Sequence, residues 1–231
     1  MMGCAVSYPE VTVIIPALNE ELSLRQVLTH LPEVGQVIVV DNGSTDRTSE
    51  IARSNGATVV SEPTRGYGRA CQTGLESALR DDARVLVILD ADFSDYPEDL
   101  HLLVDPILRD EADLVMGDRT ALAEPGALLP QQRLGNALAT FLIGRITGHR
   151  YRDMGPFRAI DRSSLVRLQM EDLNFGWNVE MQIKAIRRGL RVREVPTRYR
   201  PRIGQSKISG TVRGSLRAGT KILWSTWRYG R

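Results

Sequence analysis

The chain has 231 residues, of which 42% are hydrophobic and 25% charged, a composition typical of a globular protein with a sizeable core. Its net charge of +2 conceals an asymmetry, because 14 of the 30 basic residues but only one of the 28 acidic residues fall in residues 184–231. This basic end predicts an anionic partner such as phosphate groups, a lipid surface or nucleic acid, with a solvated basic face as the alternative.

No apolar stretch reaches the roughly 18–20 residues needed to span a bilayer, and no apolar segment near the N-terminus predicts a secretory signal. The two cysteines, Cys4 and Cys71, lie far apart, so we expect free thiols in a reducing compartment. These features predict a cytoplasmic location.

The first half of the chain alternates between strand and helix patterns. The expected strands are residues 11–15, 36–40, 57–61, 84–89 and 113–117, and the expected helices are residues 20–31, 46–55, 67–80 and 97–109. Gly35 and Gly56 stand where the first two helices are expected to stop. The alternation predicts an α/β fold with a mostly parallel sheet, helices on both faces and ligands at the carboxyl ends of the strands.

The second half is less regular. A mostly apolar helix is expected over residues 134–147, a turn into a strand over 153–160, an amphipathic helix over 177–188, a last strand over 190–195 and a basic loop over 198–207. Residues 211–229 show a basic helical pattern with tryptophans, which favours a helix in a membrane interface over one docked on the core. We therefore expect one domain over residues 1–208 and an appended amphipathic helix over 209–231.

Two aspartates, Asp90 and Asp92, follow the apolar run at residues 85–89. In a strand they would point to the same side, where two carboxylates are costly unless a positive group lies between them. Mg²⁺ or Mn²⁺ bridging the phosphates of a nucleotide suits such a pair. The alternative is a solvated loop that merely follows a strand.

Other strand ends carry similar signals. The first ends in PALNE (residues 16–20), the second in DNGSTD (41–46), and the third leads into EPTRGYG (62–68), a glycine-rich turn that contains Arg65. A turn of this kind at a helix N-terminus can hold a diphosphate. Together these segments predict a nucleotide-sugar pocket.

These residues resemble the family 2 glycosyltransferases of the GT-A fold. The resemblance rests on VTVIIPALNE, VIVVDNGSTDRT, GYGRACQTGL, LDAD, DLVMGDR and the late RxxGxSK stretch. Within that family the chain is most similar to the polyprenyl-phosphate sugar transferases of the dolichol-phosphate mannose synthase type. The resemblance implies inverting transfer of a hexose from a UDP-glucose or GDP-mannose type donor to a polyprenyl phosphate. The enzyme would use Mg²⁺ or Mn²⁺ and lie peripherally on the cytoplasmic face of a membrane.

The resemblance also implies roles for the residues of the donor site. Pro16, Asn19 and Glu20 would line the base and ribose, and Asp41 would contact the base. The nucleotide-sugar set is completed by Arg65 and Asp90, and the metal ligands would be Asp90 and Asp92. Ser94 stands where the lipid-phosphate branch often has a glutamine, which leaves a third metal contact open.

On the acceptor side the resemblance implies a set of basic residues. Arg119, Arg133 and Arg202 would clamp the acceptor phosphate and the donor diphosphate, with Lys207 at the end of the last motif. Asp92 and these three arginines form the expected catalytic set. Glu180 and Glu194 also match family positions, but a structural role remains the alternative for each.

Two alternatives remain open, and two further classes are disfavoured. The same chemistry could act on a soluble acceptor such as a small phosphorylated acid, or the chain could bind a nucleotide-sugar without catalysis. A nucleic-acid binder is disfavoured by the acidic pocket. A dinucleotide oxidoreductase is disfavoured because PALNE, not GxGxxG, follows the first strand.

Overall fold

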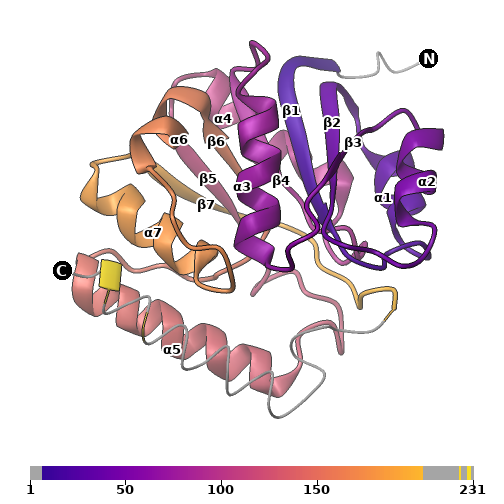
Figure 1. Ribbon diagram of the computed structural model, residues 1–231. Helices are drawn as coiled ribbons and strands as arrows, with labels where there is room; N and C mark the ends of the chain where they lie inside the picture. The colour runs from indigo at the N-terminus through magenta and orange to yellow at the C-terminus, as the bar shows by residue number, and fades with distance from the viewer. Residues whose placement is uncertain (1–6, 205–223, 225–227, 230–231) are drawn as a thin grey trace, which may run out of the picture.

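A seven-stranded sheet forms the centre of the computed structural model, which describes residues 7–204, 224 and 228–229 (Figure 1). The strands lie in the order β3-β2-β1-β4-β6-β5-β7, and β6 is antiparallel to both of its neighbours while the other pairs are parallel. The strands are β1 (Ser7–Ala17), β2 (Glu33–Asp41), β3 (Thr58–Ser61), β4 (Val85–Ile88), β5 (Leu114–Asp118), β6 (Arg158–Asp161) and β7 (Val192–Pro196). The predicted mostly parallel sheet is confirmed.

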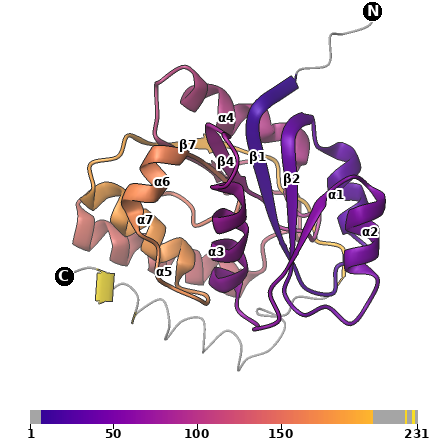
Figure 2. The same cartoon turned by 45° about the horizontal axis from the view of Figure 1, so that its top comes forward.

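Helices cover both faces of this sheet, as predicted (Figure 2). Because side chains alternate along a strand, Ile14 and Ile38 share one buried cluster with α3, α6 and α7, whereas Val13 and Val39 share another with α1, α2 and α4. The helices are α1 (Leu24–His30), α2 (Thr48–Ser54), α3 (Tyr67–Ala78), α4 (Leu100–Leu108), α5 (Pro130–Thr147), α6 (Arg162–Leu168) and α7 (Trp177–Arg187), with a 3₁₀ turn η1 (Pro97–Asp99) before α4. Figure 1 shows α5 outside these layers, beyond α7.

Every strand and helix expected before residue 118 is present, with shifted ends. The short helix α6 was not predicted. It begins where the Asp161 carboxylate accepts a hydrogen bond from the Ser164 amide at 2.9 Å, so Asp161 is its N-cap. The later elements fall where they were expected, although α5 begins at Pro130 and is longer than the predicted helix.

Gly35 does not end a helix, so that prediction was wrong. Helix α1 ends at His30, and Gly35 lies inside β2. A Cβ atom at Gly35 would stand 2.1 Å from the carbonyl oxygen of Pro9 in β1, so the close approach of the two strands requires glycine there. Gly56, in contrast, follows α2 with a φ of +82°, as expected of a residue that ends a helix.

The predicted appended helix over residues 209–231 lies largely outside the described residues. Of that segment, Tyr229 is buried, and the Nζ atom of Lys184 lies 5.3 Å from the centre of its ring. Arg228 Nη2 lies 3.3 Å from Glu171 Oε2, so the described part of this end contacts α7 and the loop before it. Among the described residues, no helix is long and apolar enough to cross a membrane.

Candidate active site

A cavity of about 630 Å³ opens at the carboxyl ends of β1, β2 and β4. Its walls include Pro16 and Glu20 after β1, Asp90 and Asp92 after β4, and Arg65 before α3. The sheet therefore brings together five of the predicted nucleotide-sugar and metal residues, because parallel strands end at the same edge.

The two aspartates lie close enough to affect each other. Asp92 is buried, and its Oδ1 atom accepts hydrogen bonds from the amide (2.9 Å) and the hydroxyl of Ser94. Asp90 accepts a hydrogen bond from the Tyr67 hydroxyl at 3.3 Å. Burial, and then the charge of Asp92, raise the pKa of Asp90 well above its usual range. A pair of carboxylates that resists carrying two charges is a site that a cation would stabilise.

The chemistry of this pair fits Mg²⁺ or Mn²⁺ held together with a diphosphate. The described residues contain no group of three His, Cys, Asp or Glu side chains that could hold a metal ion by themselves. Mg²⁺ is usually held by one or two carboxylates, with water and substrate phosphates completing its shell. At Ser94, where a third contact with the metal was left open, the hydroxyl donates a hydrogen bond to Asp92.

Arg202 reaches the same cavity from the basic loop after β7. Its Nη1 atom lies 3.3 Å from Asp92 Oδ2, and its Nη2 atom lies 3.4 Å from Glu20 Oε1. The amide of Ile203 donates a hydrogen bond to the carbonyl of Asp92 at 3.0 Å, which fixes the loop beside the cavity. A guanidinium in this position can bind phosphate oxygens in a bidentate manner when a diphosphate enters.

Asn19 and Asp41 shape this end of the sheet and do not line the cavity. Asn19 has a φ of 53°, and its Oδ1 atom accepts a hydrogen bond from the Thr45 amide at 2.8 Å. Asp41 accepts hydrogen bonds from the Ser44 amide (2.8 Å) and the Ser49 hydroxyl. Burial alone would raise the pKa of Asp41, but these hydrogen bonds outweigh it and hold the pKa below its usual value. Asn19 therefore connects the loop after β1 to the loop after β2, whereas Asp41 connects the end of β2 to the loop that follows it and to α2.

The cavity wall includes three polar or aromatic residues to which the sequence analysis assigned no role of their own: Asn42, Tyr67 and Phe175. Asn42 donates to the carbonyl oxygens of Glu62 and Thr64, both at 2.9 Å, and so holds the turn before α3. Its place directly after a predicted strand was an available signal. Phe175 offers no such signal, because it comes from the loop between α6 and α7.

Glu180 holds the loop that carries Phe175. Its buried carboxylate accepts hydrogen bonds from the amides of Glu171 (2.8 Å) and Asp172 (2.7 Å), and its Oε1 atom lies 2.6 Å from Lys184 Nζ. The same loop contacts the start of α3, where a Cβ atom on Gly68 would stand 2.1 Å from the Asp172 carbonyl oxygen. Glu180 is therefore a positioning residue for the cavity wall.

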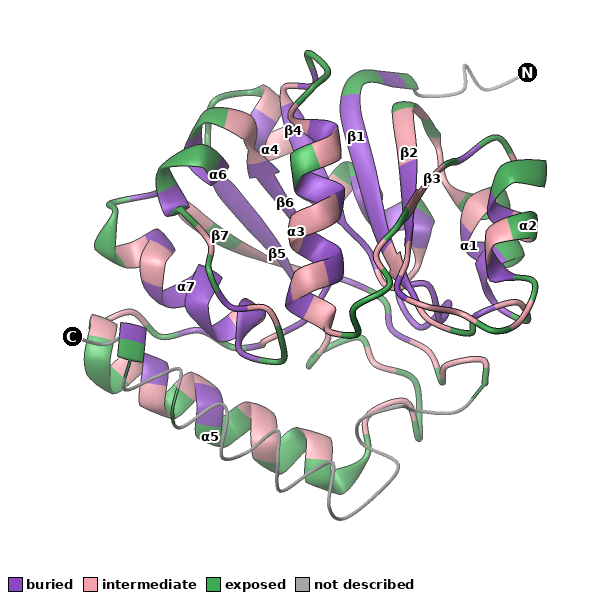
Figure 3. Cartoon of the chain, viewed as in Figure 1, coloured by how far each residue is buried: buried purple, intermediate pink, exposed green. Residues whose placement is uncertain are grey.

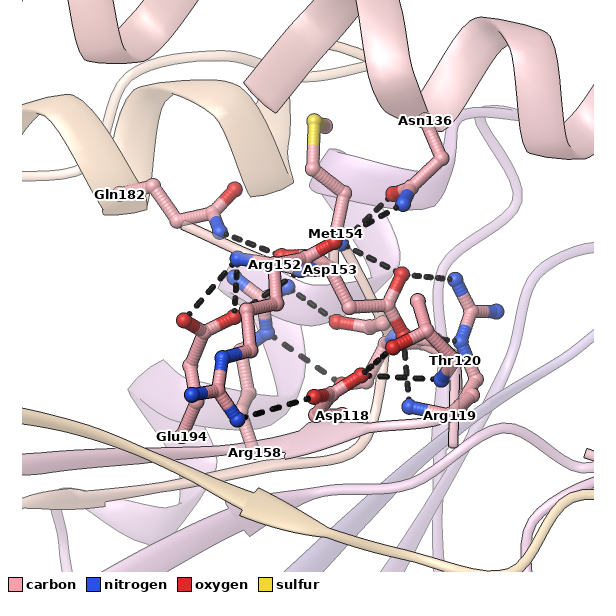
Figure 4. Close-up of polar contacts among 12 residues, drawn as sticks. Asp118, Arg119, Thr120, Asn136, Arg152, Asp153, Met154, Arg158, Gln182 and Glu194 are labelled. Carbon is pink, nitrogen blue, oxygen red and sulfur yellow. Dashed lines mark hydrogen bonds and ion pairs between the residues drawn. The ribbon is translucent and has the colours of Figure 1, made fainter. Parts of the chain in front are cut away.

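Arg119 and Arg133 line a second cavity, of about 230 Å³. Arg119 forms a bidentate pair with the buried Asp153, with Nε–Oδ2 at 2.7 Å and Nη2–Oδ1 at 2.9 Å (Figure 4). Glu194 supports this pair by accepting hydrogen bonds from the amides of Arg152 and Asp153, each at 2.9 Å. Glu194 thus has a structural role.

The three predicted arginines are therefore divided between two places: Arg202 lies at the first cavity, and Arg119 and Arg133 at the second. The strand order explains the division, because β6 separates β4 from β5 and places their ends about 10 Å apart. Lys207, the other expected phosphate contact, lies outside the described residues.

Asp95 connects the two places electrostatically. It is 1% exposed, and neither carboxylate oxygen has a hydrogen-bond partner among the described residues. Burial raises its pKa well above the usual range, against the nearby charge of Arg119, while Asp90 and Asp92 add to the increase. Charged side chains of both cavities therefore affect the pKa of Asp95.

A sequence model of glycosyl transferase family 2 matches residues 12–168 of the chain. A glycosyltransferase of Mycobacterium tuberculosis is 39% identical over 210 residues, which cover 89% of this chain and 93% of that protein. The dolichyl-phosphate hexose transferase of Haloferax volcanii is 32% identical over 211 residues, which cover 87% of this chain and 88% of that protein.

Among solved structures, the chain is similar to glucosyl-3-phosphoglycerate synthase from Mycobacterium tuberculosis in complex with Mn²⁺, UDP and phosphoglyceric acid. The TM-score is 0.76 at 21% sequence identity, and the match covers 95% of this chain and 78% of that one. This likeness establishes a shared fold, the GT-A fold that the sequence predicted.

Proposed function

Because the chain belongs to glycosyltransferase family 2, we propose that it transfers a hexose, with inversion, from a nucleoside-diphosphate sugar to a polyprenyl phosphate at a membrane surface. The observation that carries this proposal is the pair of neighbouring cavities, one with carboxylates and Arg202, the other with Arg119 and Arg133. The first suits a metal-bound diphosphate and the second a phosphate monoester. The dolichyl-phosphate hexose transferase of Haloferax volcanii supports the choice of a lipid phosphate.

In the donor cavity, Asp90 and Asp92 would hold Mg²⁺ or Mn²⁺, which supplies charge stabilisation to the leaving diphosphate. Arg202 would add a second positive charge at the same place, since it already lies against Asp92 and Glu20. Phe175 and Arg65 complete the wall around the donor. These residues keep the diphosphate in place while the bond to the sugar breaks.

On the acceptor side, Arg119 and Arg133 would hold the lipid phosphate. Such a phosphate is already an anion at neutral pH, so it can attack the anomeric carbon without a strong general base. Direct attack from the side opposite the leaving diphosphate inverts that carbon. This account needs no catalytic histidine.

Helix α5 supports a lipid rather than a soluble acceptor. The first turn of α5 lies beside the second cavity, which Arg133 lines, and the next residues Leu134 and Leu138 are exposed by 72% and 45%. Figure 3 shows exposed positions along much of α5. Large apolar side chains gathered on one exposed helix face indicate a contact surface. We propose that the enzyme lies peripherally at the cytoplasmic face of a membrane through this side.

A soluble phosphorylated acceptor is the second candidate. The structurally similar glucosyl-3-phosphoglycerate synthase was solved with phosphoglyceric acid, and the cavity of about 230 Å³ at Arg119 and Arg133 would accommodate a phosphate of either kind. A nucleotide-sugar-binding protein without catalysis would have no need of both Asp90 and Asp92.

The test is transfer of radiolabelled sugar to a short polyprenyl phosphate, with a panel of UDP- and GDP-sugars, in the presence and absence of Mg²⁺ or Mn²⁺. Metal-dependent label in the organic phase is the expected result and identifies the donor. Label only on a phosphorylated acid would overturn the lipid acceptor. Donor binding without transfer to any acceptor would overturn catalysis.

A further inference from the structure

A third cavity, of about 530 Å³, runs along α5 and has no part in the reaction described above. Arg145, Arg150 and Arg152 line it together with Thr140 and Phe141. It adjoins the acceptor cavity, because Asn136 and Thr120 line both. We call it the arginine groove.

The arginines of this groove are poorly neutralised. Among the described residues, Arg145 and Arg150 have no carboxylate within ion-pair distance, and both are exposed. Arg152 has a side chain that is 72% exposed and lies 4.0 Å from its closest carboxylate, that of Asp118. Helix α5 itself contains no acidic residue. The arginine groove is therefore lined by three positive charges that nearby carboxylates do not fully neutralise.

An apolar stripe lies beside the groove. Leu134, Leu138 and Phe141 are exposed by 72%, 45% and 63%, and their spacing of four and three residues puts them on one face of α5. Phe141 belongs to both the stripe and the groove wall. An apolar stripe bordered by arginines is complementary to a bilayer that carries negative headgroups.

We propose that the arginine groove binds the phosphoryl headgroup of an anionic phospholipid, with the apolar stripe of α5 in contact with the acyl region of the bilayer. This proposal rests on the proposed function in one respect, the lipid acceptor. Docking of the groove would bring the adjacent acceptor cavity to a polyprenyl phosphate in the same membrane. The arginines of the groove are not those that hold the acceptor, so the lipid bound here is a docking ligand and not a substrate.

The experiment measures co-flotation of the full chain with two kinds of vesicle, phosphatidylcholine alone and phosphatidylcholine mixed with phosphatidylglycerol. The double variant Arg145→Gln/Arg150→Gln is compared with Arg25→Gln/Arg80→Gln, two exposed arginines on α1 and just after α3. Loss of the groove arginines should lower partition to the anionic vesicles roughly 10- to 30-fold, and the control pair should change it little.

A second comparison tests the apolar stripe. Phe141→Ser should weaken binding to the same anionic vesicles, whereas Val166→Ser, at a position in α6 that is 56% exposed, should not. Thermal unfolding of every variant confirms that the exposed substitutions leave the fold intact.

Equal flotation of the groove variant and the wild type would overturn the proposal, as would equal binding to both kinds of vesicle. Binding of inorganic phosphate that is lost in the groove variant, without any binding to vesicles, would assign the groove to a free phosphate and overturn the lipid. Flotation does not depend on sugar transfer, so failure of the transfer assay with intact flotation would refute the proposed function alone.

Discussion

The buried pair of Arg119 and Asp153 provides the sharpest test of how the acceptor cavity is held. Asp153 accepts three hydrogen bonds from Arg119, through the amide at 3.0 Å and the guanidinium at 2.7 and 2.9 Å. The side chains are 14% and 1% exposed. Asp153→Ala would leave the guanidinium buried without its carboxylate.

Breaking a buried ion pair in this way costs about 3–5 kcal/mol. For a chain of this size, 1 kcal/mol shifts the melting temperature by roughly 2–4 °C, so Asp153→Ala should lower it by about 6–20 °C. Glu111→Ala is the matched control, because it removes a pair with Arg193 in which both side chains are about half exposed. Such surface pairs contribute about 1 kcal/mol or less.

The measurement is urea and thermal unfolding at several pH values. Burial raises the pKa of Asp153, but Arg119 and the hydrogen bonds outweigh it and hold the pKa below its usual value. The stabilisation is therefore complete above about pH 4 and is lost as the pH falls through the native pKa. The difference between wild type and Asp153→Ala should shrink only in that acidic range. If Asp153→Ala costs no more than Glu111→Ala at pH 7, the pair does not hold the cavity.

Three further predictions concern the donor cavity and the sheet. Asp92→Asn should reduce sugar transfer by at least about 100-fold with little change in melting temperature. A chelator should reduce transfer in the same way until Mg²⁺ or Mn²⁺ is restored. Full activity of the variant, or of the chelated enzyme, would contradict the metal site. Glu180→Gln should raise the KM for the donor more than it lowers kcat, because the loop of Phe175 loses its anchor, and steady-state kinetics measures this split. Gly35→Ala should destabilise the fold by about 1–3 kcal/mol in urea unfolding, since its Cβ would meet the carbonyl of Pro9 at 2.1 Å; an unchanged midpoint would mean that the strands move apart freely.

Local patterns in the sequence predicted the strands and helices, because each of them depends on residues close together along the chain. Asp90 and Asp92 directly follow an apolar strand, so their place at the sheet edge follows from parallel pairing. The prediction that Gly35 ends a helix was wrong because glycine is required there by Pro9, which lies 26 positions away in the sequence. No local sequence pattern indicates that contact. Phe175 reaches the cavity only through the packing of its loop on α3.

The strand order determines which of the three predicted arginines lies at which cavity. Arg119, Arg133 and Arg202 form one set in the sequence, but the antiparallel strand β6 lies between β4 and β5 and separates the end of β5 from the aspartates. Pairing with Asp153 already balances the charge of Arg119, whereas Arg133 has no carboxylate partner among the described residues. In the proposed reaction Arg133 therefore supplies the net attraction for the acceptor phosphate, and Arg119, fixed by Asp153, orients it.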